Sequence, residues 1–241
     1  MKIQGSVALV TGANRGIGRA FVEQMLADGA AKVYAGARNL ADLAPVVALD
    51  PARVVPVQLD VTREADITAA AAAAGDVTLL INNAGALTSG SVLDSPEDAV
   101  RRDMEVNYFG TLAVSRAFAP VLEGNGGGAL VNVLSVVSFA SMPAIGGYNA
   151  SKAAAWSLTQ SLRGELGKRG IAVFGVFPGP IDTDMAKDIP LEKTSPRVVA
   201  REVLEGLEAG AEDVFPDPMA KQVYAGWSVD HKEVERQFAA M

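Results

Sequence analysis

The sequence predicts an α/β protein: a Rossmann-like, doubly wound parallel sheet flanked by helices and built as a single domain over residues 1–241. Short apolar segments alternate with longer helical patterns along most of the chain. The apolar segments are continuous, as in parallel strands that helices cover on both faces. No internal repeat, low-complexity linker or domain break interrupts the alternation. One domain of βα units is therefore expected.

Six strands are expected where the short apolar runs occur: 7–10, 33–36, 54–59, 77–81, 129–134 and 171–177. The expected helices are 16–29, 65–74, 95–121, 147–168 and one that begins at 195. Ser95 is expected to cap the third of these helices, because a proline and two acids follow it. The rest of the chain is less regular, with a loop near 182–194 and a short run at 213–216.

The composition excludes several classes of function. The net charge is −7 and the 21 basic residues are scattered, which argues against nucleic acid or an anionic membrane as a partner. The absence of cysteine excludes disulfides and thiol chemistry, and a single histidine, His231, excludes a histidine-cluster metal site. His231 is expected in a polar terminal helix rather than in a catalytic triad. With no signal-peptide pattern and no long apolar run, the protein is expected to be cytoplasmic.

A glycine-rich segment lies between the first expected strand and its helix. Glycines 12, 16 and 18 allow a sharp turn, a close approach of the backbone to a pyrophosphate, and close packing of the helix on the strand. The start of the helix would then present free amides to the phosphates. Chance supplies roughly 0.2 such patterns in this composition. This one falls in the first βα turn, where nucleotides bind in this architecture, so nucleotide binding is expected.

The end of the second strand favours NADP over NAD. In NAD enzymes an acid at this point commonly holds the 2′-hydroxyl of the adenosine ribose. Here Ala37 is followed by Arg38, and Arg15 in the glycine segment could approach the same region. Cations suit a 2′-phosphate, and an anionic partner would explain a cation near the start of a helix. The alternative is that both arginines are simply solvated.

Tyr148 and Lys152 lie four residues apart in the helix expected over 147–168, so their side chains share one face of it. A neighbouring cation favours the phenolate form of tyrosine, whose pKa is ordinarily about 10. The two residues are therefore a candidate proton donor and acceptor. Alone the pair is a weak signal, because roughly 0.13 such pairs are expected by chance.

Taken in order, these features resemble the short-chain dehydrogenase/reductase family from about Gly5 to Thr183. The glycine segment matches the family's cofactor loop, and residues 82–85 match its Asn-Asn-Ala-Gly element. Asp60-Val61 matches the position that receives the adenine, and 178–183 resembles the segment that wraps the nicotinamide. The resemblance implies these cofactor-binding residues: Gly12, Asn14, Arg15, Gly16, Ile17, Gly18, Arg38, Asp60, Val61, Asn83, Ala84, Gly85, Tyr148, Lys152, Pro178, Gly179, Ile181 and Thr183.

The resemblance also implies four catalytic residues, Asn107, Ser135, Tyr148 and Lys152. Tyr148 would exchange a proton with a carbonyl or alcohol oxygen. Lys152 would lower the pKa of Tyr148 and bind the nicotinamide ribose. Ser135 would hydrogen-bond the substrate oxygen, and Asn107 would hold a water that links Lys152 to solvent.

The choice of Ser135 depends on spacing. It precedes Tyr148 by 13 residues, the usual separation in the family. Ser138 is the next candidate, as a contact from a substrate loop, and Ser141 fits a polar loop.

The segment 182–195 is expected to be a substrate lid. Its Met185, Ile189 and Leu191 suggest an apolar wall, although packing on the protein itself is equally compatible. The charged stretch 230–236 stands where related ketoacyl reductases have a tetramer-building tail. The expected assembly is therefore a homodimer through the long helices that begin near 95 and 147, rather than a tetramer.

The leading hypothesis is an NADP(H)-dependent carbonyl reductase, or the equivalent alcohol dehydrogenase, for a partly apolar small molecule. The first alternative is a regulator that senses the NADP redox state without turnover, although such a protein should lose the tyrosine or the lysine. A sugar-nucleotide epimerase or dehydratase is the second. Those enzymes generally carry a larger C-terminal domain than the residues after Thr183 provide.

Overall fold

The computed structural model describes residues 1–241 and contains one sheet of seven parallel strands. The strands are β1 (Val7–Thr11), β2 (Lys32–Ala37), β3 (Val54–Gln58), β4 (Leu79–Asn82), β5 (Gly128–Val133), β6 (Ile171–Val176) and β7 (Asp213–Val214). The six expected strands are confirmed, with ends shifted by one or two residues, and β7 is a seventh. The order β3-β2-β1-β4-β5-β6-β7 is that of the predicted Rossmann-like fold.

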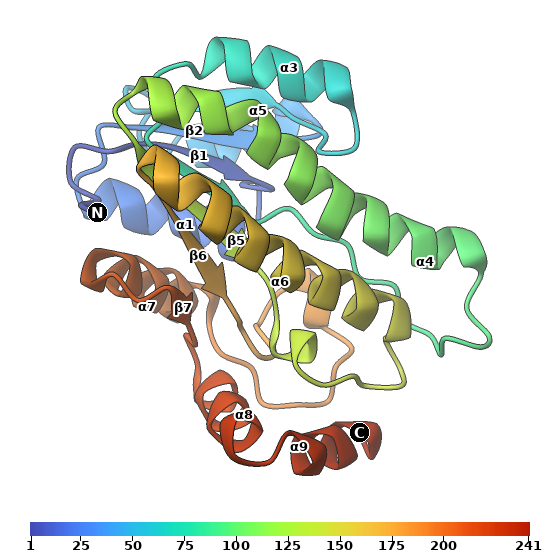
Figure 1. Ribbon diagram of the computed structural model, residues 1–241. Helices are drawn as coiled ribbons and strands as arrows, with labels where there is room; N and C mark the ends of the chain where they lie inside the picture. The colour runs from blue at the N-terminus through green and yellow to red at the C-terminus, as the bar shows by residue number, and fades with distance from the viewer.

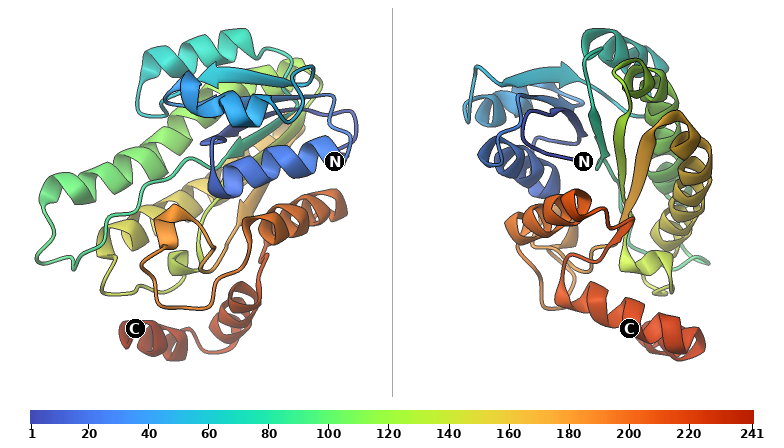
Figure 2. Two further views of the ribbon diagram at one scale, coloured as in Figure 1. Left: turned by 180° about the vertical axis from the view of Figure 1, so that it is seen from behind. Right: turned by 60° about the vertical axis from the view of Figure 1, so that its left-hand side comes forward.

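Helices cover both faces of the sheet (Figure 1). On one face α1 (Gly16–Ala27) packs beside α7 (Pro196–Ala209). The other face carries α3 (Glu64–Ala73), α5 (Thr111–Gly124) and α6 (Gly146–Leu166), as the second view in Figure 2 also shows. A short α2 (Ala44–Val47) follows β2. No helix is both long enough and apolar enough to cross a membrane.

The continuous apolar character of the strands follows from this three-layer arrangement. Successive side chains of a strand point to opposite faces of the sheet. In β1, Ala8 and Val10 therefore join the core beneath α1 and α7, whereas Leu9 joins the core beneath α5 and α6. Both faces exclude water, so both need apolar residues, as parallel sheets generally do.

The topology fixes where a ligand would bind. β1 lies between β2 and β4, so the chain's crossovers run in opposite directions on the two sides of β1. The loops that follow β1 and β4 leave the same carboxyl edge of the sheet and diverge there. A crevice at such a switch point is the usual ligand site of doubly wound sheets.

The helix expected over 95–121 is interrupted, and its predicted cap is wrong. α4 (Glu97–Met104) has Pro96, in an extended conformation, at its N-cap position, so Ser95 lies outside the helix. A π-helical turn, Glu105–Gly110, joins α4 to α5. Gly110 passes so close to the loop after β3 that a Cβ there would lie 2.7 Å from Val61 Cγ2. A π-helical turn accommodates one more residue than an α-helical turn, and this one contains Asn107.

The C-terminal part contains more structure than the sequence pattern predicts. Ser195 caps α7 as expected, and β7 is followed by α8 (Pro218–Val229) and α9 (His231–Ala239). His231 begins the terminal helix at the surface, as predicted. Side chains of α8 and α9 form one apolar cluster with the segments after β5: Val136, Val137, Ala140, Ile145, Tyr148, Ala220, Val223, Val234 and Phe238. The two last helices thus support the segment that carries Tyr148.

Candidate active site

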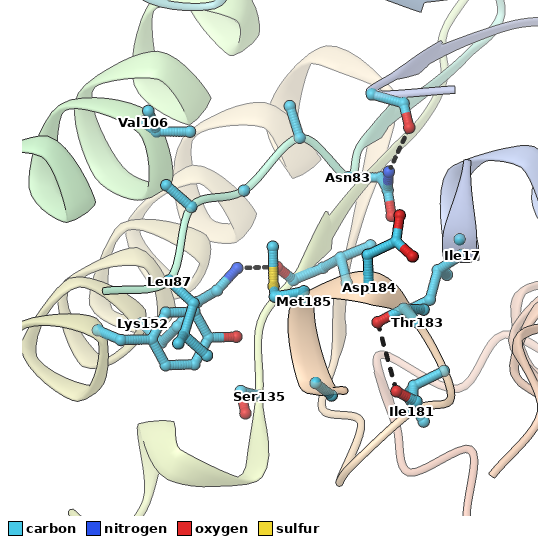
Figure 3. Close-up of a pocket in the computed structure, with 18 of the residues that line it drawn as sticks. Ile17, Asn83, Leu87, Val106, Ser135, Lys152, Ile181, Thr183, Asp184 and Met185 are labelled. Carbon is cyan, nitrogen blue, oxygen red and sulfur yellow. Dashed lines mark hydrogen bonds between the residues drawn. The ribbon is translucent and has the colours of Figure 1, made fainter. Parts of the chain in front are cut away.

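A cavity of about 1020 Å³ opens at the carboxyl edge of the sheet, where the loops after β1, β4, β5 and β6 meet. Every predicted catalytic or cofactor-binding residue lines it except two, Gly18 and Asn107, which lie directly behind its wall. In Figure 3, Lys152 and Ser135 occupy one side of the cavity and Asn83 and Ile17 the other. The structure therefore brings together residues from segments that are far apart in the sequence.

The glycine segment forms one end of the cavity. Gly12 and Gly16 have φ angles of 65° and 54°, a left-handed conformation that side chains disfavour. Gly18 serves packing instead, because a Cβ there would overlap the carbonyl oxygen of Gly12. Asn14 and Ile17 line the cavity beside the start of α1, whose free amides face a site for phosphate.

The loop after β4 is fastened to the glycine segment by hydrogen bonds. Asn83 Nδ2 donates to the carbonyl oxygens of Thr11 and Gly12 at 2.9 and 3.2 Å. The Thr11 hydroxyl accepts from the backbone amides of Asn83 and Ala84, both at 2.9 Å. Beneath them, Asn82 Nδ2 donates to Asn132 Oδ1 across β4 and β5 at 2.9 Å. These bonds hold Ala84 and Gly85 against the cavity.

The end of the cavity beside β2 and β3 contains Arg38 and Asp60. β2 ends at Ala37 as predicted, and Arg38 follows as an exposed side chain on the cavity wall. Although partial burial acts to raise the pKa of Asp60, hydrogen bonds from Thr62 and the charges of Arg38 and Arg63 hold that pKa below its usual value. Asp60 therefore stays a carboxylate. A carboxylate can accept the hydrogen bond that an adenine amino group would donate.

Arg15 does not point to the same place as Arg38. Its guanidinium forms an exposed ion pair of 2.8 Å with Asp184, which lies in the predicted lid segment. Next to this pair, a Cβ on Gly16 would lie 3.1 Å from Thr183 Cγ2. The lid segment therefore meets the glycine segment across the cavity mouth, and Arg15 belongs to that contact.

Tyr148 and Lys152 project from the first two turns of α6, and both are buried. The Lys152 ammonium lies 5.7 Å from the centre of the Tyr148 ring and donates a hydrogen bond of 2.8 Å to the carbonyl oxygen of Val133, at the end of β5. Ser135 follows β5, and its hydroxyl donates to Pro178 O at 3.4 Å and accepts from Val137 N at 3.3 Å. β5, β6 and α6 thus converge on this end of the cavity.

Of the three candidate serines, only Ser135 lines the cavity. The Ser138 hydroxyl donates to the carbonyl oxygen of Lys152 at 3.1 Å, so it supports α6 from behind. Ser141 lies in an exposed loop. The geometry therefore agrees with the choice made from spacing.

The pKa of Tyr148 shifts in the direction opposite to the one expected. Burial raises it to about 12, and the negative charge of Asp103 adds to this, although the Ser135 hydroxyl acts in the opposite direction. Burial also lowers the pKa of Lys152 to about 8, against the opposing effect of Asp103. The prediction from sequence considered only the attraction between cation and phenolate. In the folded chain the loss of hydration is the larger effect for both groups.

Asn107 joins three segments of the site. Its Oδ1 accepts from the amide of Ala86 at 2.9 Å, and its Nδ2 donates to Ala86 O and to the Ser151 hydroxyl, both at 2.8 Å. Its backbone carbonyl accepts from the Thr111 hydroxyl at 2.8 Å. The side chain thus connects the loop after β4 to α6. The expected water between Lys152 and solvent stays a prediction.

The part of the cavity beyond Tyr148 is apolar. Leu87, Val136, Val137, Met142 and Ile145 line it, together with Met185, Ile189 and Leu191 of the lid segment. The sequence left open whether the three residues of segment 182–195 form a cavity wall or pack on the protein itself. In the structure they line the cavity. In the view of Figure 3, Met185 projects between Lys152 and Asn83.

Two buried carboxylates of this region were not predicted. Asp217 caps α8 through Ala220 N at 2.9 Å and also accepts from Gly179 N at 2.8 Å, which anchors the segment after β6. Asp103 lies in the last turn of α4 and is fully buried. The sequence held one signal for each: Asp217 precedes a proline as helix caps do, and Asp103 stands four residues before Asn107, on the same helix face.

The fold and the site define a class, that of α/β proteins with a dinucleotide site at the switch point of a parallel sheet. The chain belongs to the short-chain dehydrogenase family, whose model matches residues 6–194, and it is therefore an oxidoreductase. The resemblance inferred from the motifs is confirmed.

Solved structures of the family are similar over nearly the whole chain. A short chain dehydrogenase from Burkholderia cenocepacia J2315, in complex with NADP, is 44% identical and covers 99% of both chains with a TM-score of 0.93. A short chain dehydrogenase/reductase from Burkholderia phymatum, in complex with NAD, is 28% identical, with a TM-score of 0.87 over 98% of this chain and 96% of the other. A 3-alpha-(or 20-beta)-hydroxysteroid dehydrogenase of Mycobacterium tuberculosis is 36% identical over 194 residues, 78% of this chain and 74% of that protein.

Proposed function

We propose that the protein is an NADP(H)-dependent carbonyl reductase that interconverts a ketone or aldehyde and an alcohol, with Tyr148 as the general acid and base. The observation that carries this proposal is the convergence of Tyr148, Ser135 and Lys152 on one end of a cavity whose other end is the glycine segment. A dinucleotide in this cavity would have its phosphates at the start of α1 and its reactive ring near Tyr148.

The proton transfer is assigned to Tyr148. Its raised pKa keeps the phenol protonated at neutral pH, as a donor to a carbonyl oxygen must be. A nicotinamide held in the cavity would supply the hydride for the carbonyl carbon, and Tyr148 would give its proton to the carbonyl oxygen, so that one carbonyl becomes one alcohol. Ser135, beside it, would donate a hydrogen bond to the same oxygen and stabilise the charge that develops there.

Lys152 has two roles in this proposal. Its ammonium would bind the hydroxyls of the nicotinamide ribose, and its charge would stabilise the phenolate that Tyr148 becomes after giving up its proton. Both roles need the protonated lysine. Because burial lowers the pKa of Lys152 to about 8, its charge is present at neutral pH and is lost in mildly alkaline solution.

NADP(H) is proposed as the preferred cofactor. β2 ends at Ala37 without a carboxylate that would repel a 2′-phosphate, and Arg38 stands beside it on the cavity wall. The Burkholderia cenocepacia relative, at 44% identity, was solved with NADP. The Burkholderia phymatum relative, at 28% identity, was solved with NAD, so the fold alone does not select the cofactor.

The substrate is proposed to be a partly apolar ketone, aldehyde or alcohol. Beyond Tyr148 the cavity is walled by Leu87, Val137, Ile145 and the lid residues Met185 and Ile189. Apolar walls with a few polar groups at one point suit a ligand with one carbonyl on an apolar body. Segment 182–195 is proposed to close over this ligand as a lid.

A homodimer is proposed as the assembly. The outer surfaces of α5 and α6 form a shallow groove of about 440 Å³, lined in part by Tyr108, Leu112 and Leu158. Phe109, 48% exposed, lies beside it in the π-helical turn. The same helices of a second copy would cover these side chains. Light scattering of the purified chain, compared with Phe109→Asp, tests the assembly; a monomer for both would contradict it.

The experiment that tests the function is a screen of ketones, aldehydes and alcohols with NADPH, NADH and their oxidised forms. Turnover is followed by the absorbance of the reduced nicotinamide. The expected result is reduction of at least one apolar ketone, faster with NADPH than with NADH. Tight binding of NADPH without turnover of any compound would favour the regulatory alternative instead.

A further inference from the structure

Asp103 is a buried carboxylate that the proton transfer described above does not use. It lies in the last turn of α4, and none of its surface is exposed. Burying a carboxylate is costly unless hydrogen bonds or charges compensate for the lost hydration. Two hydrogen bonds come from one residue, Thr88: its hydroxyl donates to Oδ1 at 3.1 Å and its amide to Oδ2 at 3.3 Å. Thr88 belongs to the loop after β4 and lines the cavity.

The carboxylate also lies against the start of α6. A Cβ on Gly147, the residue before Tyr148, would lie 3.3 Å from Asp103 Oδ2 and 3.3 Å from Val100 Cα. α4 packs against α6, and the two helices lie near each other in Figure 1. Ile145 at the N-cap position offers α6 no side-chain cap. The free amides of a helix start favour a negative charge nearby.

The charges around Asp103 connect it to the proposed proton transfer. From α6 it faces Lys152 and Tyr148, and from its own helix Arg102. The loop after β4 contributes Thr88, which does not titrate. The Lys152 ammonium donates its hydrogen bond to a carbonyl oxygen and forms no ion pair, and the negative charge that acts on it is that of Asp103.

We propose that Asp103 is a positioning residue for the reaction: its carboxylate holds the substrate-facing Thr88 against the helix that carries Tyr148, and its negative charge keeps Lys152 protonated in the buried site. This inference rests on the proposed carbonyl reductase activity. Asp103 touches neither the cavity nor a reacting atom, and it acts through Thr88 and Lys152.

Burial and the surrounding groups act on the pKa of Asp103 in opposite directions. Burial raises its pKa, while the two hydrogen bonds of Thr88 and the charges of Arg102 and Lys152 act to lower it. In turn, the negative charge of Asp103 raises the pKa of both Lys152 and Tyr148. Removing that charge therefore makes Lys152 lose its proton at a lower pH.

The test is the pH profile of kcat/KM for reduction, measured for the wild-type protein, Asp103→Asn and Thr88→Val with NADPH and the ketone reduced fastest in the screen. Asp103→Asn keeps the size of the side chain and removes its charge. We expect the alkaline limb of its profile to move to lower pH, together with a loss of kcat of about tenfold. Thr88→Val keeps the charge, so its alkaline limb should stay in place while kcat falls.

Glu97→Gln is the matched control, because Glu97 is an exposed carboxylate on the same helix. Its profile should match that of the wild type.

If Asp103→Asn lowers activity without moving the alkaline limb, Asp103 is only a structural residue and the proposal is overturned. Asp103→Ser, a second neutral variant with room for a water, gives the same test should Asp103→Asn not fold. Absence of wild-type turnover would instead refute the proposed function.

Discussion

The Lys152 ammonium lies 5.7 Å from the centre of the Tyr148 ring, and both side chains are buried at the start of α6. Burial opposes the charged form of each residue, so at neutral pH the phenol is neutral and the ammonium titrates not far above pH 7. Neutral tyrosine beside charged lysine is the arrangement suited to donating a proton. The carbonyl reduction proposed above needs these protonation states.

Replacing Tyr148 by phenylalanine removes the proton donor and keeps the ring. Tyr148→Phe should lower kcat by about a thousandfold, within the range for loss of a general acid. The dissociation constant for NADPH, measured by fluorescence titration, should change by no more than about twofold. Tyr224→Phe, a change at a partly exposed ring away from the cavity, is the control and should be fully active. Activity retained in Tyr148→Phe would remove this residue from the mechanism.

The rate of reduction should depend on pH through Lys152. Its folded-state pKa is about 8, so the ammonium loses its proton as the pH rises through that value. The pKa of Tyr148, about 12, lies too high for the phenol to ionise in this range. We expect kcat/KM for reduction to be level from about pH 6 to 7.5 and to fall above pH 8. A profile that stays level to pH 9.5 would contradict the role given to the lysine charge.

Lys152→Met should stabilise the fold while abolishing turnover. Burial lowers the pKa of Lys152 from 10.5 to about 8, so the unfolded chain holds this proton more tightly than the folded chain. Removing the buried charge should remove a cost of up to about 3 kcal/mol at pH 7, less what Asp103 and the Val133 carbonyl lose with their partner. The advantage over the wild type should shrink as the pH rises from 8 towards 10. Urea denaturation at pH 7 and pH 9.5 measures it, and a less stable variant at both would disprove the argument.

Cofactor preference should depend on the end of β2. Arg38→Ala removes the cation next to the proposed 2′-phosphate site, and Ala37→Asp adds a charge that repels it. Each should lower the ratio of kcat/KM with NADPH to that with NADH by about tenfold or more. Arg169→Ala serves as the control, because Arg169 forms an ion pair with Glu123 outside the cavity. An unchanged ratio in both variants would show that these positions do not select the cofactor.

Asp217 should matter for stability and for cofactor binding together. It is buried and accepts hydrogen bonds from Gly179 N and Ala220 N. Asp217→Ala removes a helix cap and leaves a buried amide unpaired, which should lower the free energy of unfolding by about 2 kcal/mol. Because Gly179 lines the cavity, the KM for NADPH should rise as well. Thermal unfolding measures the first effect and initial rates at varied NADPH measure the second; an unchanged KM would show that Asp217 does not act on the cofactor site.

Much of this architecture was predictable because local patterns and global fold agree. The apolar runs that become β1 and β5 are buried on both faces, and the glycines at 12, 16 and 18 fit only a tight βα turn. The motifs of the family then pointed to residues that line the cavity, with the exceptions of Gly18 and Asn107. Residues whose chemistry fixes their position, such as Gly18 and Tyr148, can be placed from sequence alone.

What was missed depends on contacts between distant segments. The π-helical turn around Asn107 follows the same apolar pattern as a regular helix, and it ends at Gly110, which lies against Val61 of a distant segment. The raised pKa of Tyr148 required knowledge of its burial. In the sequence Asp103 resembles any charged residue of a helix, and its burial results from the packing of α6 against it. Charge patterns in sequence do not reveal which carboxylate becomes buried.

The apolar cluster that contains Tyr148 also contains Val234 and Phe238, which are close to the last residue of the sequence. A domain generally folds as a unit during synthesis, so the packing around Tyr148 has to wait for these late residues. The support beneath Tyr148 is complete only after position 238 has left the ribosome.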